Sequence, residues 1–426
     1  MSKKMTPGIW THLIEPEPAG HFAAGPARGP GLDAGFDFAV KANIEVAGLP
    51  ASAGSPVFDG YLPLADSPVV ATLKRHGGRL AGLTNMHELA FGITSNNAVF
   101  GPVPNPFDPL RSAGGSSGGS AASVAAGLVQ ISLGTDTGGS VSIPAAACAV
   151  VGFRPTTGRW PGAGTIGLSW SRDTIGVHAR SVAHVRTVDS WITHDRRESV
   201  GAGAPVLGVP TAFLRDLDPS VVQRFGEVLA TLRKNHDVIE VDLDEVFAQT
   251  DAAQWDLVGW EAPRLLAAHL AAAEDLSPAA AWKQVVARAA SPDVRTVLAG
   301  YDADPVTADA YARAIQLMDA ARDNYAATIA GFGLDALVFP TLPCLPTPIG
   351  QDLVVSHLGK QVPVFPLMNR HVGPGTVLGV PSVSLPAGMG DVRLPVGITL
   401  QGHAHRDRAL LDIAGQVEAL LAPMQP

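Results

Sequence analysis

The chain has 426 residues, of which 46% are hydrophobic and only 16% are charged, so we expect a large folded core and exclude a disordered or fibrous protein. The formal net charge of −9 and the lack of any lysine- or arginine-rich run argue against a nucleic-acid or anionic-membrane partner. Glu15 and Glu17 precede any long apolar stretch, and no run of about 18 uncharged apolar residues follows. We therefore expect neither a signal peptide nor a transmembrane helix, and we expect a cytoplasmic protein.

Short apolar runs alternate with helix-favouring segments along the first third of the chain. A strand is expected to end at Lys41. Further strands are expected at 80–83 and 130–133, with helices at 71–76 and 120–128.

The second half begins with strands at 206–209 and 238–241 on either side of a well-signalled helix. Asp218 can cap this helix and Pro219 suits its first turn. The 3.6-residue periodicity predicts one apolar face, formed by Val222, Phe225, Leu229 and Leu232.

Residues from about 245 to 330 are alanine-rich, with three or four helical periods and almost no strand signal. Strands return at 334–339, 383–385 and 397–400, and an amphipathic helix at 407–421 ends the pattern. We interpret residues 1–426 as one α/β domain in which about 245–330 form a helical insert.

Two cysteines, Cys148 and Cys344, stand in apolar segments. Two buried free thiols in a reducing compartment are therefore expected, and neither a disulfide nor a metal site. His403 and His405 could be read as a metal pair, but no third ligand is nearby, so a solvated turn before the last helix is the expected role.

The most unusual segment is the glycine- and serine-rich run at 113–120. One alternative is a flexible linker, but this run leads directly into an apolar, helix-favouring stretch. A phosphate-binding loop is the other alternative, but no Gly-Lys-Ser/Thr follows and the dinucleotide spacing is absent.

A second glycine-rich element runs from Leu133 to Ser140. A helix and a strand between the two elements could bring Ser116 and Ser140 to the same edge of a sheet. Gly138 and Gly139 would allow a sharp turn whose N–H groups point at one spot. Such converging donors are what an oxyanion hole requires, because negative charge grows on the attacked carbonyl oxygen.

A serine nucleophile needs a base, and no histidine stands in a recognisable nucleophile elbow around Ser140. Lys41 follows an apolar strand-like run and is the other candidate. A lysine at a strand end is usually a surface residue, but a desolvated lysine loses its proton more easily and can act as a base.

These three elements together resemble the amidase-signature family, and the segment 114–152 is similar to the family's defining block. The resemblance implies a single α/β domain with a central mixed, twisted β-sheet covered by α-helices on both sides. It implies a triad of Lys41, Ser116 and Ser140, in which Ser116 follows a cis peptide bond, and it implies no metal or other cofactor. The implied oxyanion donors are the backbone N–H groups of Thr137, Gly138 and Gly139.

The same resemblance suggests that Ser117 and Asp136 support the triad, with ordinary turn and capping roles as the alternative. Two positions depart from the family pattern. Ala42 stands where an aspartate is common, and Ser142 stands where an arginine often follows the nucleophile. Many members also carry a longer helical leader before the lysine.

The segments 85–97 and 171–174 are similar to the indoleacetamide and mandelamide hydrolase branch of the family, which acts on primary amides of arylacetic-type acids. Met86, Phe91 and Thr94 are therefore candidates to line a largely apolar pocket, with a core role as the alternative. The helical insert is expected to form part of the substrate pocket. Its aromatic residues have outer-wall or plain packing roles as alternatives: Trp255, Trp260 and Tyr311.

The leading functional hypothesis is an amidohydrolase for a small, largely apolar carboxamide, with anilides, esters or carbamates as related substrates. The rival on the same fold is the amidase subunit of a glutamine-dependent amidotransferase, which would need companion subunits. A rival of another class is a non-catalytic binding protein. A small-molecule amide and, at most, a second copy of the chain in a homodimer are the expected partners.

Overall fold

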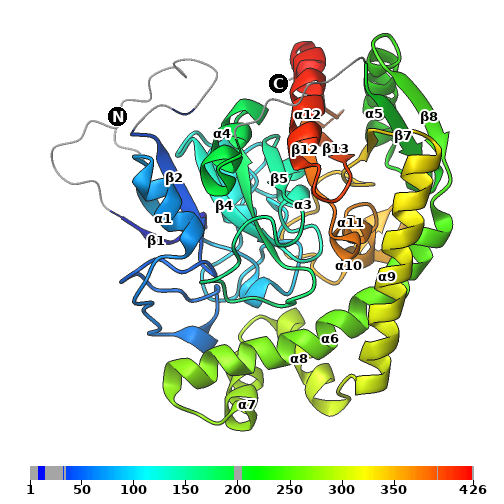
Figure 1. The fold of residues 1–426 in the computed structure, drawn as a ribbon. Coiled ribbons are helices and arrows are strands. Elements are labelled where there is room, and N and C mark those ends of the chain that lie inside the picture. Colours follow the sequence, from blue (N-terminus) through cyan, green and yellow to red (C-terminus); the bar gives the residue numbers. More distant parts are fainter. Residues whose placement is uncertain (1–7, 15–31, 33–34, 196–203, 391, 425–426) are drawn as a thin grey trace.

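The computed structural model describes residues 8–14, 32, 35–195, 204–390 and 392–424 (Figure 1). Eleven of the strands in these residues form one sheet, in the order β1-β3-β2-β4-β6-β5-β12-β13-β9-β7-β8. The strands are β1 (Trp10–Leu13), β2 (Asp37–Lys41), β3 (Arg79–Thr84), β4 (Ile131–Asp136), β5 (Val151–Arg154), β6 (Thr174–Ala179), β7 (Val206–Pro210), β8 (Asp237–Val241), β9 (Ala336–Pro340), β12 (Ser382–Met389) and β13 (Pro395–Gln401).

The sheet is mixed. Strand β2 runs parallel to both β3 and β4, and β7 runs parallel to β8 and β9, whereas the central strands pair antiparallel. The parallel pairing of β2 with β4 matters most for function, because both strands end at the same edge. Lys41 closes β2 at that edge and Asp136 closes β4.

Helices cover both faces of the sheet, which confirms the predicted fold class. One face carries α1 (Pro68–Arg75), α4 (Val182–Thr193), α5 (Pro219–Leu232) and α12 (Asp407–Leu421), whose apolar side chains join the main core. The other face carries α2 (Gly118–Ala125) and α3 (Ser142–Ala147). These two helices are built mainly from alanine, glycine and serine, so they approach the strands closely.

The predicted apolar face of α5 is confirmed at Phe225 and Leu232, and Leu229 packs against the core, but Val222 is wrong. The side chain of Val222 is 54% exposed, whereas the neighbouring Val221 is buried. The residues that face the core are Val221, Phe225, Val228 and Leu232. The predicted cap and first turn are confirmed, because Asp218 accepts a hydrogen bond from the Ser220 N–H.

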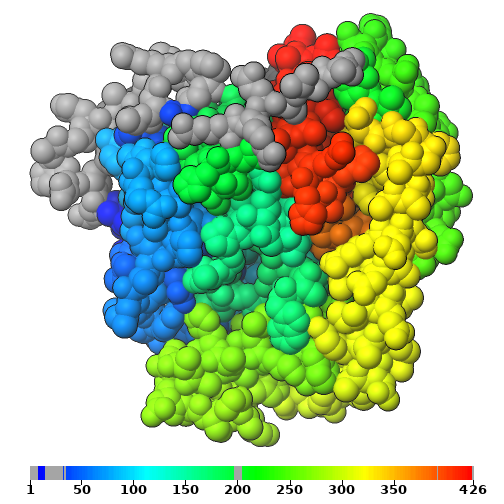
Figure 2. Space-filling model, viewed as in Figure 1, coloured from blue at the N-terminus to red at the C-terminus, as the bar shows by residue number. Residues whose placement is uncertain are grey.

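The alanine-rich region forms four helices: α6 (Asp244–Glu274), α7 (Pro278–Arg288), α8 (Pro292–Ala303) and α9 (Ala308–Gly331). Helices α6 and α9 pack against each other, and α7 packs against α6. Figure 2 shows this region wrapping the lower and right-hand edges of the molecule, in yellow-green and yellow.

The remaining strands and α-helices of the described residues lie between β9 and β12. They are the hairpin of β10 (Val354–His357) and β11 (Lys360–Pro363), followed by the short helices α10 (Val364–Asn369) and α11 (Gly373–Leu378). Both cysteines are buried free thiols, as predicted. Within the described ranges, every helix is too short or too polar to cross a membrane.

Candidate active site

Lys41 lies at the end of β2 with its side chain fully buried. Its Nζ donates hydrogen bonds to the hydroxyls of Ser116 and Thr135, each at 2.8 Å. Asn43 steadies the same threonine, because its amide donates to Thr135 Oγ1 at 3.1 Å. The amine of Lys41 is therefore held by hydroxyl groups rather than by a paired carboxylate.

Burial lowers the pKa of Lys41 from 10.5 to about 7, because water is absent to solvate the ammonium form. The negative charges of Asp136 and Asp173 oppose this shift, but they are too weak to cancel it. A substantial fraction of Lys41 is therefore neutral at neutral pH, which is the state that a proton-accepting base requires.

The peptide bond between Gly115 and Ser116 is cis, as the resemblance implied. Ser116 is fully buried next to Lys41, whereas Ser140 lines a cavity. The Ser117 N–H donates to the Ser140 carbonyl at 3.3 Å, which joins the two glycine-rich segments. In the described residues no hydrogen bond links the hydroxyls of Ser116 and Ser140.

Asp136 organises the turn between β4 and α3. Its carboxylate accepts hydrogen bonds from the backbone N–H groups of Gly139, at 2.8 Å, and Val141, at 2.7 Å. The Gly139 N–H is thus occupied by Asp136, and the expected oxyanion role of Gly139 is not supported. Gly139 has a φ of +98°, and a Cβ there would lie 2.3 Å from Val372, so the position requires glycine.

Thr137 and Gly138 both line the cavity beside Ser140. Across the described ranges, neither of their backbone N–H groups donates to another group, so both remain free for a ligand oxygen. Their other polar atoms are fixed: Thr137 Oγ1 donates to Asp173 at 2.5 Å, and Asn369 donates to the Gly138 carbonyl at 2.6 Å. The turn is therefore held by side-chain hydrogen bonds on both sides, while the two backbone N–H groups stay available beside the cavity.

Ser117 stabilises the end of β4, which leads into this turn. Its hydroxyl donates to the Thr135 carbonyl at 3.1 Å and accepts from the Thr135 N–H at 3.3 Å. Ser117 thus connects the segment that carries Ser116 to the strand that leads to Ser140. The two departures from the family pattern are accommodated, because Ala42 and Ser142 are both buried and Ser142 Oγ lies 3.5 Å from Ser382 Oγ.

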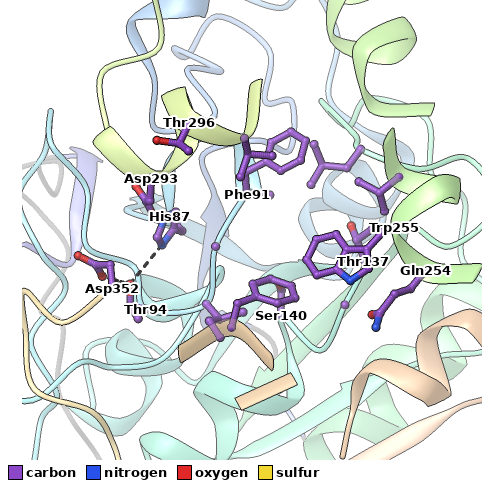
Figure 3. Close-up of a pocket in the computed structure, with 18 of the residues that line it drawn as sticks. His87, Phe91, Thr94, Thr137, Ser140, Gln254, Trp255, Asp293, Thr296 and Asp352 are labelled. Atoms are coloured by element: carbon purple, nitrogen blue, oxygen red, sulfur yellow. Dashed lines mark hydrogen bonds and ion pairs between the residues drawn. The ribbon is translucent and has the colours of Figure 1, made fainter. Parts of the chain in front are cut away.

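The cavity has a volume of about 220 Å³ and is mostly apolar (Figure 3). Phe91 and Thr94 line it, whereas Met86 is fully buried outside the lining and contributes a core contact. Trp255 from α6 lines it and packs on Phe365 at a ring distance of 5.0 Å. The other two aromatic candidates do not line it: Trp260 and Tyr311 stack on each other at 5.2 Å.

Other functional candidates were missed by the sequence reasoning. His87, Asp293 and Asp352 line the cavity and form its polar side. Thr135 and Asn43 border a second cavity of about 230 Å³, which shares Thr137 with the first. His87 could have been found from the sequence, because the adjacent pair His87-Glu88 lies within the segment 85–97. Asp293 lies in the first turn of a helix and Asp352 lies in a loop, and no sequence motif marks either position.

No group of three or more histidine, cysteine, aspartate or glutamate side chains could hold a metal ion in the part of the chain that the structure describes. The groups beside Lys41 and Ser140 are hydroxyls, one amine and backbone N–H groups. Such a set can activate a hydroxyl and stabilise an oxyanion.

The sequence of the chain is similar to those of known amidases. The amidase family model matches residues 27–411. The chain is 37% identical over 393 residues to the indoleacetamide hydrolase of Rhizobium radiobacter, covering 90% of this chain and 83% of that protein. It is 34% identical over 408 residues to the mandelamide hydrolase of Pseudomonas putida, covering 91% and 78%.

A crystal structure of an amidase superposes with a TM-score of 0.80 and 33% identity, covering 91% of this chain and 85% of the other. Fold, site and sequence thus define a hydrolase of amide C–N bonds. The chain belongs to the amidase family.

Proposed function

We propose that this chain hydrolyses the C–N bond of a small aryl carboxamide through an acyl-enzyme on Ser140. The observation that carries the proposal is the fully buried Lys41 amine, 2.8 Å from the Ser116 hydroxyl, at the edge where Ser140 meets an apolar cavity.

In the first step, neutral Lys41 accepts the Ser116 proton while Ser116 accepts the proton of Ser140. The Ser140 oxygen attacks the amide carbon, and the oxyanion accepts hydrogen bonds from the N–H groups of Thr137 and Gly138. When the C–N bond breaks, the proton returns from Lys41 through Ser116 to the departing nitrogen. Water then attacks the acyl ester by the same relay, which releases the carboxylic acid and restores Ser140.

The substrate class follows from the cavity. Phe91, Leu168, Trp255 and Phe365 offer aromatic and aliphatic surface for an aryl group, while the reacting carbonyl lies beside Ser140. Two of the relatives are named as hydrolases of indoleacetamide and of mandelamide, which are amides of this kind. Anilides and esters with the same acyl side would give the same acyl-enzyme, and carbamates would give a carbamoyl- or alkoxycarbonyl-enzyme by the same attack.

The test is release of ammonia and phenylacetic acid from phenylacetamide by the purified chain alone. Ser140→Ala should lower kcat by a factor of at least about 10³. Ser190→Ala, which removes a hydroxyl from α4 far from the cavity, serves as the matched control and should keep normal turnover.

Full turnover by Ser140→Ala would overturn the nucleophile. Ammonia release that requires glutamine and a companion protein would instead identify an amidotransferase subunit. A chain that binds phenylacetamide but never releases ammonia would be a binding protein on this fold.

A further inference from the structure

One side of the cavity carries four polar residues, which we call the polar wall: His87, Thr94, Asp293 and Asp352. Figure 3 shows them gathered on the side of the cavity away from Trp255 and Thr137. The proposed mechanism uses none of them. In a cavity lined mainly by apolar side chains, such a group calls for a polar partner on the ligand.

The upper half of the polar wall is firmly held. His87 Nε2 lies 2.8 Å from Asp293 Oδ2, in the first turn of α8. The neighbouring Glu88 is fully buried and accepts hydrogen bonds from the N–H groups of Ala290 and Ser291, just before that helix. His87 and Glu88 thus hold the start of α8, and with it Asp293, beside the cavity.

Burial alone would raise the pKa of Asp293, but hydrogen bonds from His87 and from backbone N–H groups outweigh this effect and lower it. Asp293 is therefore a charged hydrogen-bond acceptor at neutral pH. Its side chain keeps 20% of its surface exposed, so a ligand can reach it.

The lower half is formed by Asp352. Its Oδ1 accepts hydrogen bonds from the Thr94 hydroxyl and from the Asn96 amide, both at 2.5 Å. In the part of the chain that is described, no group donates to Oδ2 of Asp352. One carboxylate oxygen is thus anchored and the other remains an acceptor without a donor.

Basic side chains do not neutralise this wall. Within the described residues, His87 is the only cationic or titratable base within ion-pairing distance of Asp293, and Asp352 forms no ion pair. Arg172 also lines the cavity, but its guanidinium donates to the Gln254 carbonyl and the Thr376 hydroxyl. The wall therefore presents two carboxylates as acceptors, of which Asp293 has a basic partner in His87 and Asp352 has none in the described residues.

We propose that the polar wall selects aryl amides whose acyl side carries a hydrogen-bond donor, a hydroxyl or N–H group, which binds the carboxylates of Asp352 and Asp293. This inference rests on the proposed function and names its substrate class more closely. An acceptor-only or purely apolar aryl group would desolvate the open Oδ2 of Asp352 without supplying a donor, at a cost in affinity.

The test compares phenylacetamides that carry hydroxyl, aminomethyl or methyl at the meta or para position. A hydrogen bond to a charged acceptor is worth about 1.5–3 kcal/mol, so kcat/KM for the better donor should exceed that of its methyl counterpart by at least about tenfold. The aminomethyl compound carries a cationic donor and the hydroxyl compound a neutral one, so the comparison shows whether the wall prefers a charged donor.

Asp352→Asn keeps the shape and the anchoring oxygen but removes the charge. It should reduce the donor preference, the ratio of kcat/KM for the donor compound to that for the methyl compound, at least about threefold. Asp304→Asn, an exposed carboxylate outside the cavity, is the matched control and should leave the preference intact. Circular dichroism and melting temperature confirm that each variant is folded.

Equal kcat/KM for donor and methyl compounds, or a donor preference that survives both Asp352→Asn and Asp293→Asn, would overturn the inference. Turnover of the methyl compound without donor preference would leave the proposed function standing. If no phenylacetamide is turned over, the dissociation constants of the same compounds with Ser140→Ala, measured by calorimetry, decide the donor preference independently.

Discussion

The proposed chemistry depends first on the protonation state of one side chain. Lys41 is buried without a salt bridge, so desolvation dominates its pKa, while the carboxylates of Asp136 and Asp173 pull the pKa upward. The base is active only when neutral. We therefore expect kcat/KM to rise with pH and to level off above an apparent pKa of about 7.

Removing one of the negative charges that raise the pKa of Lys41 should shift the pH profile of kcat/KM in a defined direction. Asp173→Asn keeps acceptor capacity for Thr137 but deletes a negative charge that favours the ammonium form of Lys41. The acid limb of the kcat/KM profile should therefore move to lower pH. An acid limb that stays in place or moves upward, in a variant with normal circular dichroism, would contradict the assignment of this limb to Lys41.

At the scale of elements, the sheet supplies the reacting groups and the helical insert supplies the pocket. Parallel pairing of β2 with β4 brings Lys41 and the turn after Asp136 to one edge. Helices α6 and α8 then contribute cavity residues that no strand could reach, among them Trp255 and Asp293.

Trp255→Ala tests the role of α6. Loss of an aromatic wall should raise KM for phenylacetamide several-fold and leave kcat nearly unchanged, because the ring contacts the acyl group in ground state and transition state alike. Trp282→Ala on α7 removes a tryptophan outside the cavity lining and is the control. An unchanged KM in steady-state kinetics for Trp255→Ala would place the aryl group elsewhere.

Local patterns in the sequence predicted most elements but only part of the site. Apolar runs and caps located β2, β4, α5 and the last helix well, because burial of one face imposes a local period. Val222 was misplaced since Val221 and Val222 both fit an apolar stripe, and only packing decides between them.

Apart from Thr94, the residues of the polar wall escaped prediction for a different reason. His87 and Asp293 are 206 positions apart, and Thr94 and Asp352 are 258 apart, so their pairing exists only in the folded chain. The occupied N–H of Gly139 was equally hidden, because it depends on how Asp136 orients its carboxylate.

For the whole molecule, a buried neutral lysine carries a cost in stability that depends on pH. The unfolded chain keeps the Lys41 proton up to about pH 10.5, whereas the folded chain releases it near pH 7. Between these values the unfolded state binds more protons, so this residue's contribution to stability improves as pH rises and worsens as pH falls toward 7.

The prediction compares wild type with Lys41→Met in urea unfolding at several pH values. The free energy of unfolding of wild type, minus that of the variant, should increase by about 1.4 kcal/mol per pH unit between about pH 7 and 10. Other titrating groups cancel in the difference. Parallel stability curves for the two proteins would mean that Lys41 keeps an ordinary pKa.

The relay from Lys41 through Ser116 to Ser140 is tested most directly by the rate of covalent labelling with a fluorophosphonate as a function of pH, with peptide mapping of the labelled residue. The account predicts a single label on Ser140, with a rate that rises through about pH 7 in wild type and is lost in a folded Lys41→Met variant. A label on another residue, or a labelling rate on Ser140 that Lys41→Met leaves unchanged, would contradict it.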